Sequence, residues 1–154
     1  MQSLVCIGLN YRTAALALRE KFAWEADARR ACMKEQLAAG MADEALVFST
    51  CNRGEVYFGG PRARPEELMR SLAQAAGVAP SELDAKAYRL EDEQAMQHLF
   101  RVAAGLDSMA VGEHEILGQV ARAYDDARQW GSAGKQLSKL FQAALVGGKR
   151  VDAL

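Results

Sequence analysis

Two short β-prone runs separated by a polar turn constrain the fold of this chain more than any other stretch. Leu46–Phe48 and Val56–Phe58 are rich in the branched and aromatic residues that strands favour. Residues 49–54 between them read Ser-Thr-Cys-Asn-Arg-Gly, and asparagine and glycine tolerate the unusual backbone angles of turns. The pattern therefore predicts two strands joined by a turn that holds the Cys51 thiol at the mouth of a sheet.

The flanking stretches extend this hairpin to a strand, helix, strand, strand, helix, strand order over residues 1–90. Leu4–Asn10 is a compact apolar run typical of a strand. The other predicted elements are a helix over Ala14–Ala23 capped by Thr13, a helix over Glu25–Ala39 stopped by Gly40, a helix over Pro65–Ala76 stopped by Gly77, and a strand over Lys86–Leu90. This order predicts a ferredoxin-like α+β sandwich with a four-stranded antiparallel sheet.

Residues 91–154 have helical periodicity and predict a C-terminal helical bundle as a second subdomain. Asp92 is expected to cap the first helix, and Gly131 to end the second. The expected buried stripes are Ala95, Met96, Leu99, Phe100, Ala103 and Leu106; then Ile116, Leu117, Val120, Tyr124 and Ala127; then Leu137, Leu140, Phe141, Ala144 and Leu145.

The composition narrows the class of protein. The 154 residues include 19 basic and 20 acidic side chains, so no overall basic excess indicates a nucleic-acid partner, although a local patch is compatible with one. The 3 cysteines and 2 histidines lack metal-ligand spacing, which argues against a disulfide framework or a structural zinc site. We therefore expect no metal. Without a targeting or membrane-spanning segment, a cytoplasmic location is expected.

Cys51 has two interpretations on the residues alone. A free cysteine at the end of a strand is most often a small buried apolar residue. Alternatively, Cys51 is a reactive group. The guanidinium of Arg53 can then lower the pKa of the Cys51 thiol, or can bind a substrate carboxylate with two hydrogen bonds. Cys6, on the first strand, and Cys32, on a helix face, are expected to be packing residues.

Several stretches taken together resemble the N-terminal catalytic domain of the glutamyl-tRNA reductase family. They run in order along nearly the whole chain, which makes chance agreement improbable. The matching stretches are Gly8–Thr13, Leu18–Lys21, Ser49–Arg53, Glu55–Tyr57, His98–Met109, Gly112–Glu113 and Ile116–Val120. The chain departs from the family pattern at His114-Glu115, where many members have Pro-Gln, and at Gly54, where threonine is usual and where we expect only the turn to change.

The resemblance implies a set of site residues. Cys51 would be the catalytic nucleophile, and His98 a second catalytic residue that protonates the leaving oxygen or steadies the thiolate. The resemblance implies no metal ligand. The implied substrate-binding positions are Thr50, Asn52, Arg53, Ser108, Glu113, His114, Glu115 and Gln119.

The resemblance also implies a reaction: reduction of glutamyl-tRNA(Glu) to glutamate-1-semialdehyde through a Cys51 thioester, with NADPH as hydride donor. This is the first step of five-carbon tetrapyrrole biosynthesis, the route to 5-aminolevulinate, porphyrin and heme. Family members bind NADPH in a second domain and dimerise through a third, and this sequence contains no G-x-G-x-x-G stretch after a strand. We therefore expect a monomeric catalytic module. The alternatives are a glutamyl-tRNA esterase and a non-catalytic ferredoxin-like binding module.

Overall fold

A four-stranded antiparallel sheet forms the centre of the molecule. The computed structural model describes residues 3–106 and 115–152, with side chains described to residue 150. The strands are β1 (Leu4–Asn10), β2 (Ala42–Ser49), β3 (Arg53–Pro61) and β4 (Tyr88–Glu91). They lie in the order β2-β3-β1-β4, and each neighbouring pair is antiparallel. The predicted four-stranded antiparallel sheet is thus confirmed.

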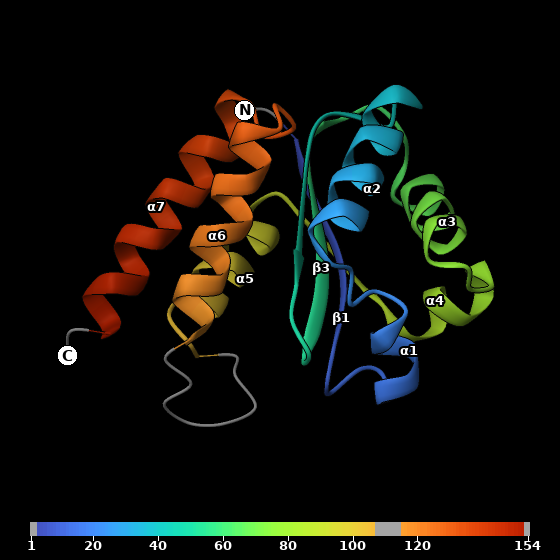
Figure 1. The fold of residues 1–154 in the computed structure, drawn as a ribbon, viewed down its shortest axis with the longest axis horizontal. Helices are drawn as coiled ribbons and strands as arrows, with labels where there is room; N and C mark the ends of the chain where they lie inside the picture. Colours follow the sequence, from blue (N-terminus) through green and yellow to red (C-terminus); the bar gives the residue numbers. More distant parts are fainter. Residues whose placement is uncertain (1–2, 107–114, 153–154) are drawn as a thin grey trace.

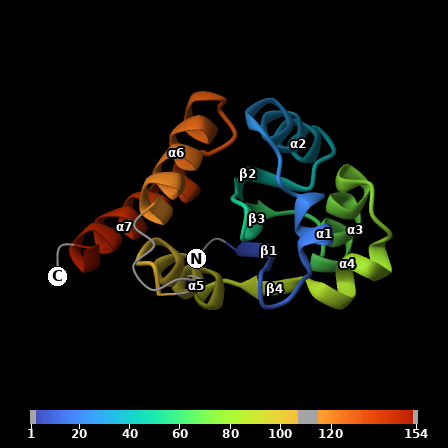
Figure 2. The ribbon, with the colours of Figure 1, turned by 60° about the horizontal axis from the view of Figure 1, so that its bottom comes forward.

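Helices cover both faces of this sheet, as Figures 1 and 2 show. On one side lie α1 (Leu16–Glu20), α2 (Ala26–Ala38), α3 (Pro65–Ala76) and α4 (Pro80–Lys86). On the other lie α5 (Glu93–Ala103), α6 (Glu115–Gln129) and α7 (Lys135–Asp152). Because α5–α7 pack directly on the strands, they share the sheet with the N-terminal helices. The division at residue 90 stays a prediction. None of the described helices is both long enough and apolar enough to cross a bilayer.

The two helical layers explain why β3 carries different side chains on its two faces. Strand side chains alternate between faces. Gly54 lies against Phe22 on the α1–α4 side. Tyr57 packs edge-on against Phe141 of α7 on the other side, with ring centroids 5.2 Å apart. The same alternation places Arg53 and Glu55 on the α5–α7 side, so two charged residues of a buried strand point into one layer.

Local signals located several elements correctly. The first strand has the predicted bounds, and α3 runs over the predicted Pro65–Ala76. The backbone φ of Gly77, directly after α3, is 71°, and that of Gly40 is 73°. Glycine adopts this left-handed conformation without steric cost, which is why it ends helices.

Other predictions near the sheet were wrong. The helix expected over Ala14–Ala23 is shorter in the structure, where α1 covers only Leu16–Glu20. Thr13 does not cap this helix; its hydroxyl instead accepts a hydrogen bond from the Asn10 amide (3.1 Å). Helix α4 was not predicted, because a 7-residue helix with Leu83 as its one buried residue has too little periodicity. The last strand begins two residues later than expected, because α4 extends to Lys86.

The predicted stripe of α5 was partly wrong. Ala95, Leu99 and Ala103 are buried as expected, whereas Phe100 and Leu106 are exposed. Val102 is buried instead. The side of the helix that faces the sheet therefore includes His98, which lies four residues before Val102. Asp92 stands at the predicted N-terminal position, but its carboxylate accepts a hydrogen bond from the Leu4 amide (3.0 Å) and caps nothing.

Candidate active site

Cys51 lies at the tip of the tight turn between β2 and β3. The Thr50 amide donates to the Arg53 carbonyl (2.8 Å), which closes the turn around Cys51 and Asn52. The Asn52 amide donates to the Thr50 hydroxyl (3.2 Å). Cys51 is exposed, whereas Cys6 and Cys32 are buried. The interpretation of Cys51 as a buried apolar residue is therefore wrong, and its thiol is open to a ligand.

Gly54 belongs to the strand and not to the turn. It is buried in β3, and a Cβ atom at this position would lie 2.9 Å from the Cβ of Phe22. That separation is shorter than packed carbon atoms tolerate. The absence of a side chain thus lets the segment before α2 pack on the sheet. The expectation that glycine at position 54, in place of the threonine usual in the family, changes only the turn was therefore wrong.

A buried carboxylate, Glu55, organises the face of β3 next to this turn. Its side chain is fully buried. The Tyr57 hydroxyl donates to Oε1 (2.9 Å), and the Tyr88 hydroxyl donates to Oε2. The same Oε2 contacts Nε2 of His98 and lies 3.3 Å from Nη1 of Arg53. Side chains from β3, β4 and α5 thus meet on one carboxylate.

The charge of Glu55 follows from these contacts. Burial raises the pKa of Glu55, but the hydrogen bonds and charges of His98, Arg53 and Tyr88 outweigh burial and lower it to about 2. Burial and the Glu55 charge raise the pKa of Tyr57 and Tyr88 well above the ordinary value. At neutral pH the carboxylate is therefore ionised and both hydroxyls remain donors.

His98 lies between α5 and the sheet, with 14% of its side chain exposed. Its ring contacts Glu55 and lies 5.2 Å from the Tyr88 ring, centroid to centroid. A carboxylate that contacts a histidine ring fixes the orientation of the ring, which suits a group that transfers a proton. Among the described residues the Cys51 thiol has no hydrogen bond, so the structure does not join Cys51 directly to His98.

Residue-level reasoning missed Glu55 as a site residue. In the sequence, Glu55 belongs to one of the stretches that resemble the family. The available signal was the alternation along β3: Arg53, Glu55 and Tyr57 share one face, and a carboxylate in a buried strand requires partners. The partner His98 lies 43 residues away, which no local pattern reveals.

The predicted substrate residues lie at the Cys51 turn, on α6 and outside the described residues. Thr50, Asn52 and Arg53 lie in or directly after the Cys51 turn, and Arg53 is buried. Gln119 of α6 lines a pocket of about 250 Å³ with Ser49, Arg29, Arg122 and Asp126, and its Oε1 has no hydrogen-bond partner among the described residues. Glu115 is exposed at the start of α6. Ser108, Glu113 and His114 lie outside the described residues.

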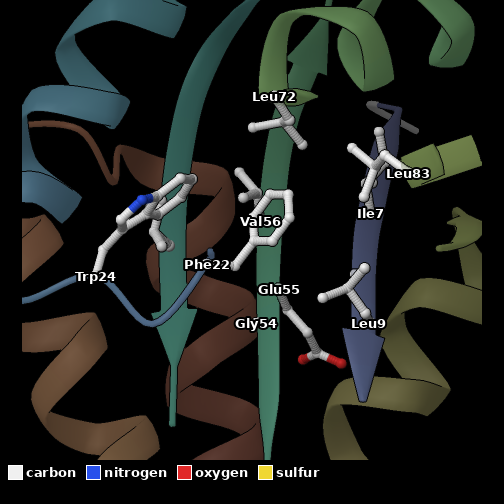
Figure 3. A pocket seen from close by; sticks show the side chains of 11 residues that line it. Ile7, Leu9, Phe22, Trp24, Gly54, Glu55, Val56, Leu72 and Leu83 are labelled. Carbon is white, nitrogen blue, oxygen red and sulfur yellow. The ribbon is translucent and has the colours of Figure 1, made fainter. Parts of the chain in front are cut away.

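The small cavity on the other face of the sheet belongs to the core. It holds about 10 Å³ and is lined mainly by apolar side chains, among them Ile7, Phe22 and Leu72. This is too small for more than about one water molecule. Figure 3 shows Glu55 at its margin with the carboxylate directed away from Leu72. The cavity therefore does not bind substrate.

The described strands do not fit NADPH. A dinucleotide site of the G-x-G-x-x-G type needs parallel strands with a glycine-rich turn leading into a helix. All strand pairs in the described part of the chain are antiparallel.

The side chains of Cys6, Glu55 and His98 bring metal-ligating atoms together. These atoms lie within 4.8 Å of one another.

The comparisons with known proteins agree with this geometry. The family described as glutamyl-tRNAGlu reductase, N-terminal domain, matches residues 7–153. The glutamyl-tRNA reductase of Thermobifida fusca is 43% identical over 96% of this chain and 31% of its own length. That of Polaromonas naphthalenivorans is 44% identical over 97% of this chain and 35% of its length.

A solved structure supports the same assignment. The glutamyl-tRNA reductase from Methanopyrus kandleri superposes with a TM-score of 0.81 and 35% sequence identity, over 99% of this chain and 35% of that one. The chain thus spans about a third of the length of the relatives that it matches. The family match, the alignments and the shared fold show that this chain belongs to the glutamyl-tRNA reductase N-terminal domain family.

Proposed function

We propose that this chain performs the acyl-transfer part of glutamyl-tRNA reduction, with Cys51 as nucleophile. The observation that carries the proposal is the exposed Cys51 thiol at the tip of the β2–β3 turn, directly before the strand that carries the buried, ionised Glu55. A thiolate is a strong nucleophile toward an ester carbonyl. Family membership makes glutamyl-tRNA the substrate to test first.

The proposed step exchanges an ester for a thioester. The Cys51 sulfur forms a bond to the glutamyl carbonyl carbon, and the bond from that carbon to the ribose oxygen of the tRNA breaks. His98 supplies the proton that the departing oxygen needs, and the proton that the exposed Cys51 thiol gives up to solvent balances the one that His98 regains from solvent. Glu55 contributes by holding the His98 ring in place. Because His98 and Cys51 are not in contact, the bound acceptor end has to lie between them.

Polar residues around the turn are proposed to orient the glutamyl group. Arg53 supplies a guanidinium for the side-chain carboxylate, and Gln119 supplies an amide from the pocket beside Ser49. Thr50 and Asn52 position the turn itself through their hydrogen bond. The remaining proposed substrate contacts are Ser108, Glu113, His114 and Glu115.

Hydride transfer is proposed to need a part of the protein beyond the described fold, since the described strands do not fit NADPH. NADPH bound elsewhere would reduce the thioester to glutamate-1-semialdehyde, in the cytoplasm, as the first step of tetrapyrrole biosynthesis. Dimerisation of the whole enzyme through another domain is part of this proposal. We also propose that the β2-β3-β1-β4 sheet with its crossover helices is of the ferredoxin-like type.

Intact-mass analysis after incubation with glutamyl-tRNA, without any nicotinamide, tests the proposal. We expect a glutamyl adduct on the peptide that contains Cys51, and none in Cys51→Ser. The matched control is Cys32→Ser, which removes a buried thiol of α2 and should leave the adduct in place. If the wild-type chain binds glutamyl-tRNA but forms no adduct and releases no glutamate, the chain is a binding module and the acyl-transfer proposal fails.

A second candidate function is hydrolysis of glutamyl-tRNA. The exposure of Cys51 favours it, because a thioester at an exposed turn is accessible to water when no hydride arrives. The same experiment separates the two functions. An adduct that persists for many turnover times supports transfer to a reductant, whereas rapid loss of the adduct with release of free glutamate supports the esterase.

A further inference from the structure

Cys6, Glu55 and His98 place three metal-ligating groups at one point beside the sheet. The Cys6 sulfur, a Glu55 oxygen and a His98 ring nitrogen all lie within 4.8 Å of one another. They belong to β1, β3 and α5, so the fold brings them together and no sequence spacing announces them. A thiolate, a carboxylate and an imidazole form a donor set suited to Zn²⁺ and similar borderline ions.

The spacing suits a tetrahedral ion. With metal–ligand bonds of about 2.0–2.3 Å, neighbouring ligand atoms of a tetrahedral zinc site lie roughly 3.5 Å apart. No separation in the cluster exceeds 4.8 Å, so the ligand atoms already lie close to that spacing. Glu55 and His98 are now in direct contact, and they would separate to admit the ion.

The surroundings support such a site. The Tyr57 and Tyr88 hydroxyls donate to Glu55 and hold its carboxylate, as outer partners commonly do for metal ligands. Binding of a dication displaces the thiol proton of Cys6, and the thiolate and the Glu55 carboxylate then carry the two negative charges that balance the ion. Of the three ligands only His98 is partly exposed, which gives the ion its entry.

We propose that Cys6, Glu55 and His98 bind one Zn²⁺ ion. A bound ion occupies a ring nitrogen of His98 and separates the ring from Glu55. This last consequence rests on the proposed function: the ion withdraws the proton donor of acyl transfer, so Zn²⁺ acts as an inhibitor through a site distinct from the exposed Cys51 thiol.

Two measurements on the 154-residue chain test the site directly. Zn²⁺ is titrated against a chromophoric chelator, and Co²⁺ is added to metal-free protein while the visible and near-ultraviolet absorption is recorded. We expect one Zn²⁺ per chain, and for Co²⁺ a thiolate charge-transfer band together with the intense visible bands of a tetrahedral ion. Cys6→Ala should weaken Zn²⁺ binding by at least about 30-fold and remove the charge-transfer band.

Matched variants separate this site from other thiols. Cys51→Ala removes the exposed thiol and Cys32→Ala the other buried one, and both should bind Zn²⁺ like the wild type. His98→Ala, at a partly exposed position, gives a second test if Cys6→Ala does not fold, and it should weaken binding by at least about 10-fold. The proposal is overturned if the wild type binds no Zn²⁺, or if Cys51→Ala abolishes binding while Cys6→Ala preserves it.

An activity measurement tests the consequence separately. Saturating Zn²⁺ should slow formation of the Cys51 adduct at least about 10-fold in the wild type and have little effect in Cys6→Ala. Equal slowing in both proteins would overturn the inhibitory role. If the wild type forms no adduct even without Zn²⁺, the proposed function fails, while the binding measurements still decide whether the metal site exists.

Discussion

At the scale of single residues, the candidate site is organised by a carboxylate that almost no water reaches. Glu55 is tolerated in a buried strand because two tyrosine hydroxyls, one guanidinium and one imidazole contact it. A buried charge without such partners is strongly destabilising. The contacts that stabilise Glu55 are also those that position His98, so stability and proposed function depend on the same residue.

The pKa of Glu55 predicts how stability depends on pH. Its folded-state value of about 2 lies below the ordinary value of 4.5, so ionised Glu55 stabilises the fold fully above pH 4.5, and this contribution is lost as pH falls toward 2. We expect Glu55→Gln to lower the free energy of unfolding by roughly 3 kcal/mol at pH 7 and by progressively less below pH 4. Urea unfolding of metal-free protein between pH 7 and pH 3 measures both.

The control for this prediction is Glu66→Gln. Glu66 pairs with Arg89 at 3.2 Å, but both side chains are exposed, and exposed pairs contribute about 0–1 kcal/mol. Its unfolding curves should follow those of the wild type at every pH. Parallel loss of stability with falling pH in the wild type and in Glu55→Gln would contradict the assignment of an ionised, buried Glu55.

At the scale of elements, a strand residue caps a distant helix. The Glu44 carboxylate on β2 accepts hydrogen bonds from the amides of Gly134 (2.6 Å), Gln136 (3.1 Å) and Leu137 (2.9 Å) at the start of α7. Helix N-termini leave such amides unpaired and carry partial positive charge. Glu44 therefore fixes α7 to the sheet at the end where the helix begins.

Removal of this carboxylate should weaken the molecule measurably. Glu44→Ala leaves three helix amides without their acceptor, and we expect a loss of about 1–2 kcal/mol in thermal or urea unfolding. The neighbouring Asp43→Ala is the matched control, because its pair with Arg62 is exposed and should contribute no more than about 0.5 kcal/mol. Equal effects of the two substitutions would show that Glu44 does not act as a cap.

The elements also show which parts of the structure a sequence can predict. Helix α3 was located correctly because Pro65 and Gly77 lie at its own ends, and β1 because its apolar run is continuous. The cap from Glu44 and the contact between Glu55 and His98 join residues far apart in the chain, so local patterns do not contain them. The Cys51 turn is local, and its position was predicted; that its thiol is exposed depends on the packing around it.

At the scale of the whole molecule, both edges of the sheet are protected from pairing with another chain. At the β2 edge, the Ala45 amide donates to the Ser132 carbonyl (2.9 Å), and an ion pair between Arg29 of α2 and Asp126 of α6 (3.1 Å) lies across the same side. The opposite edge, β4, is only 4 residues long. Short or covered edge strands are a common defence against association.

We therefore expect the 154-residue chain to be a monomer at micromolar concentration, with light scattering giving the mass of one chain. The large exposed apolar side chains among the described residues are Leu16, Phe100, Leu106 and Val146. Phe100 also lines a groove between α5 and α7, together with the apolar side chains of Met96 and Leu140. A mass that rises toward two chains with concentration would contradict the prediction. Phe100→Ser would then test the contact: if it restores the monomer, association uses this groove, and if it does not, association uses another surface.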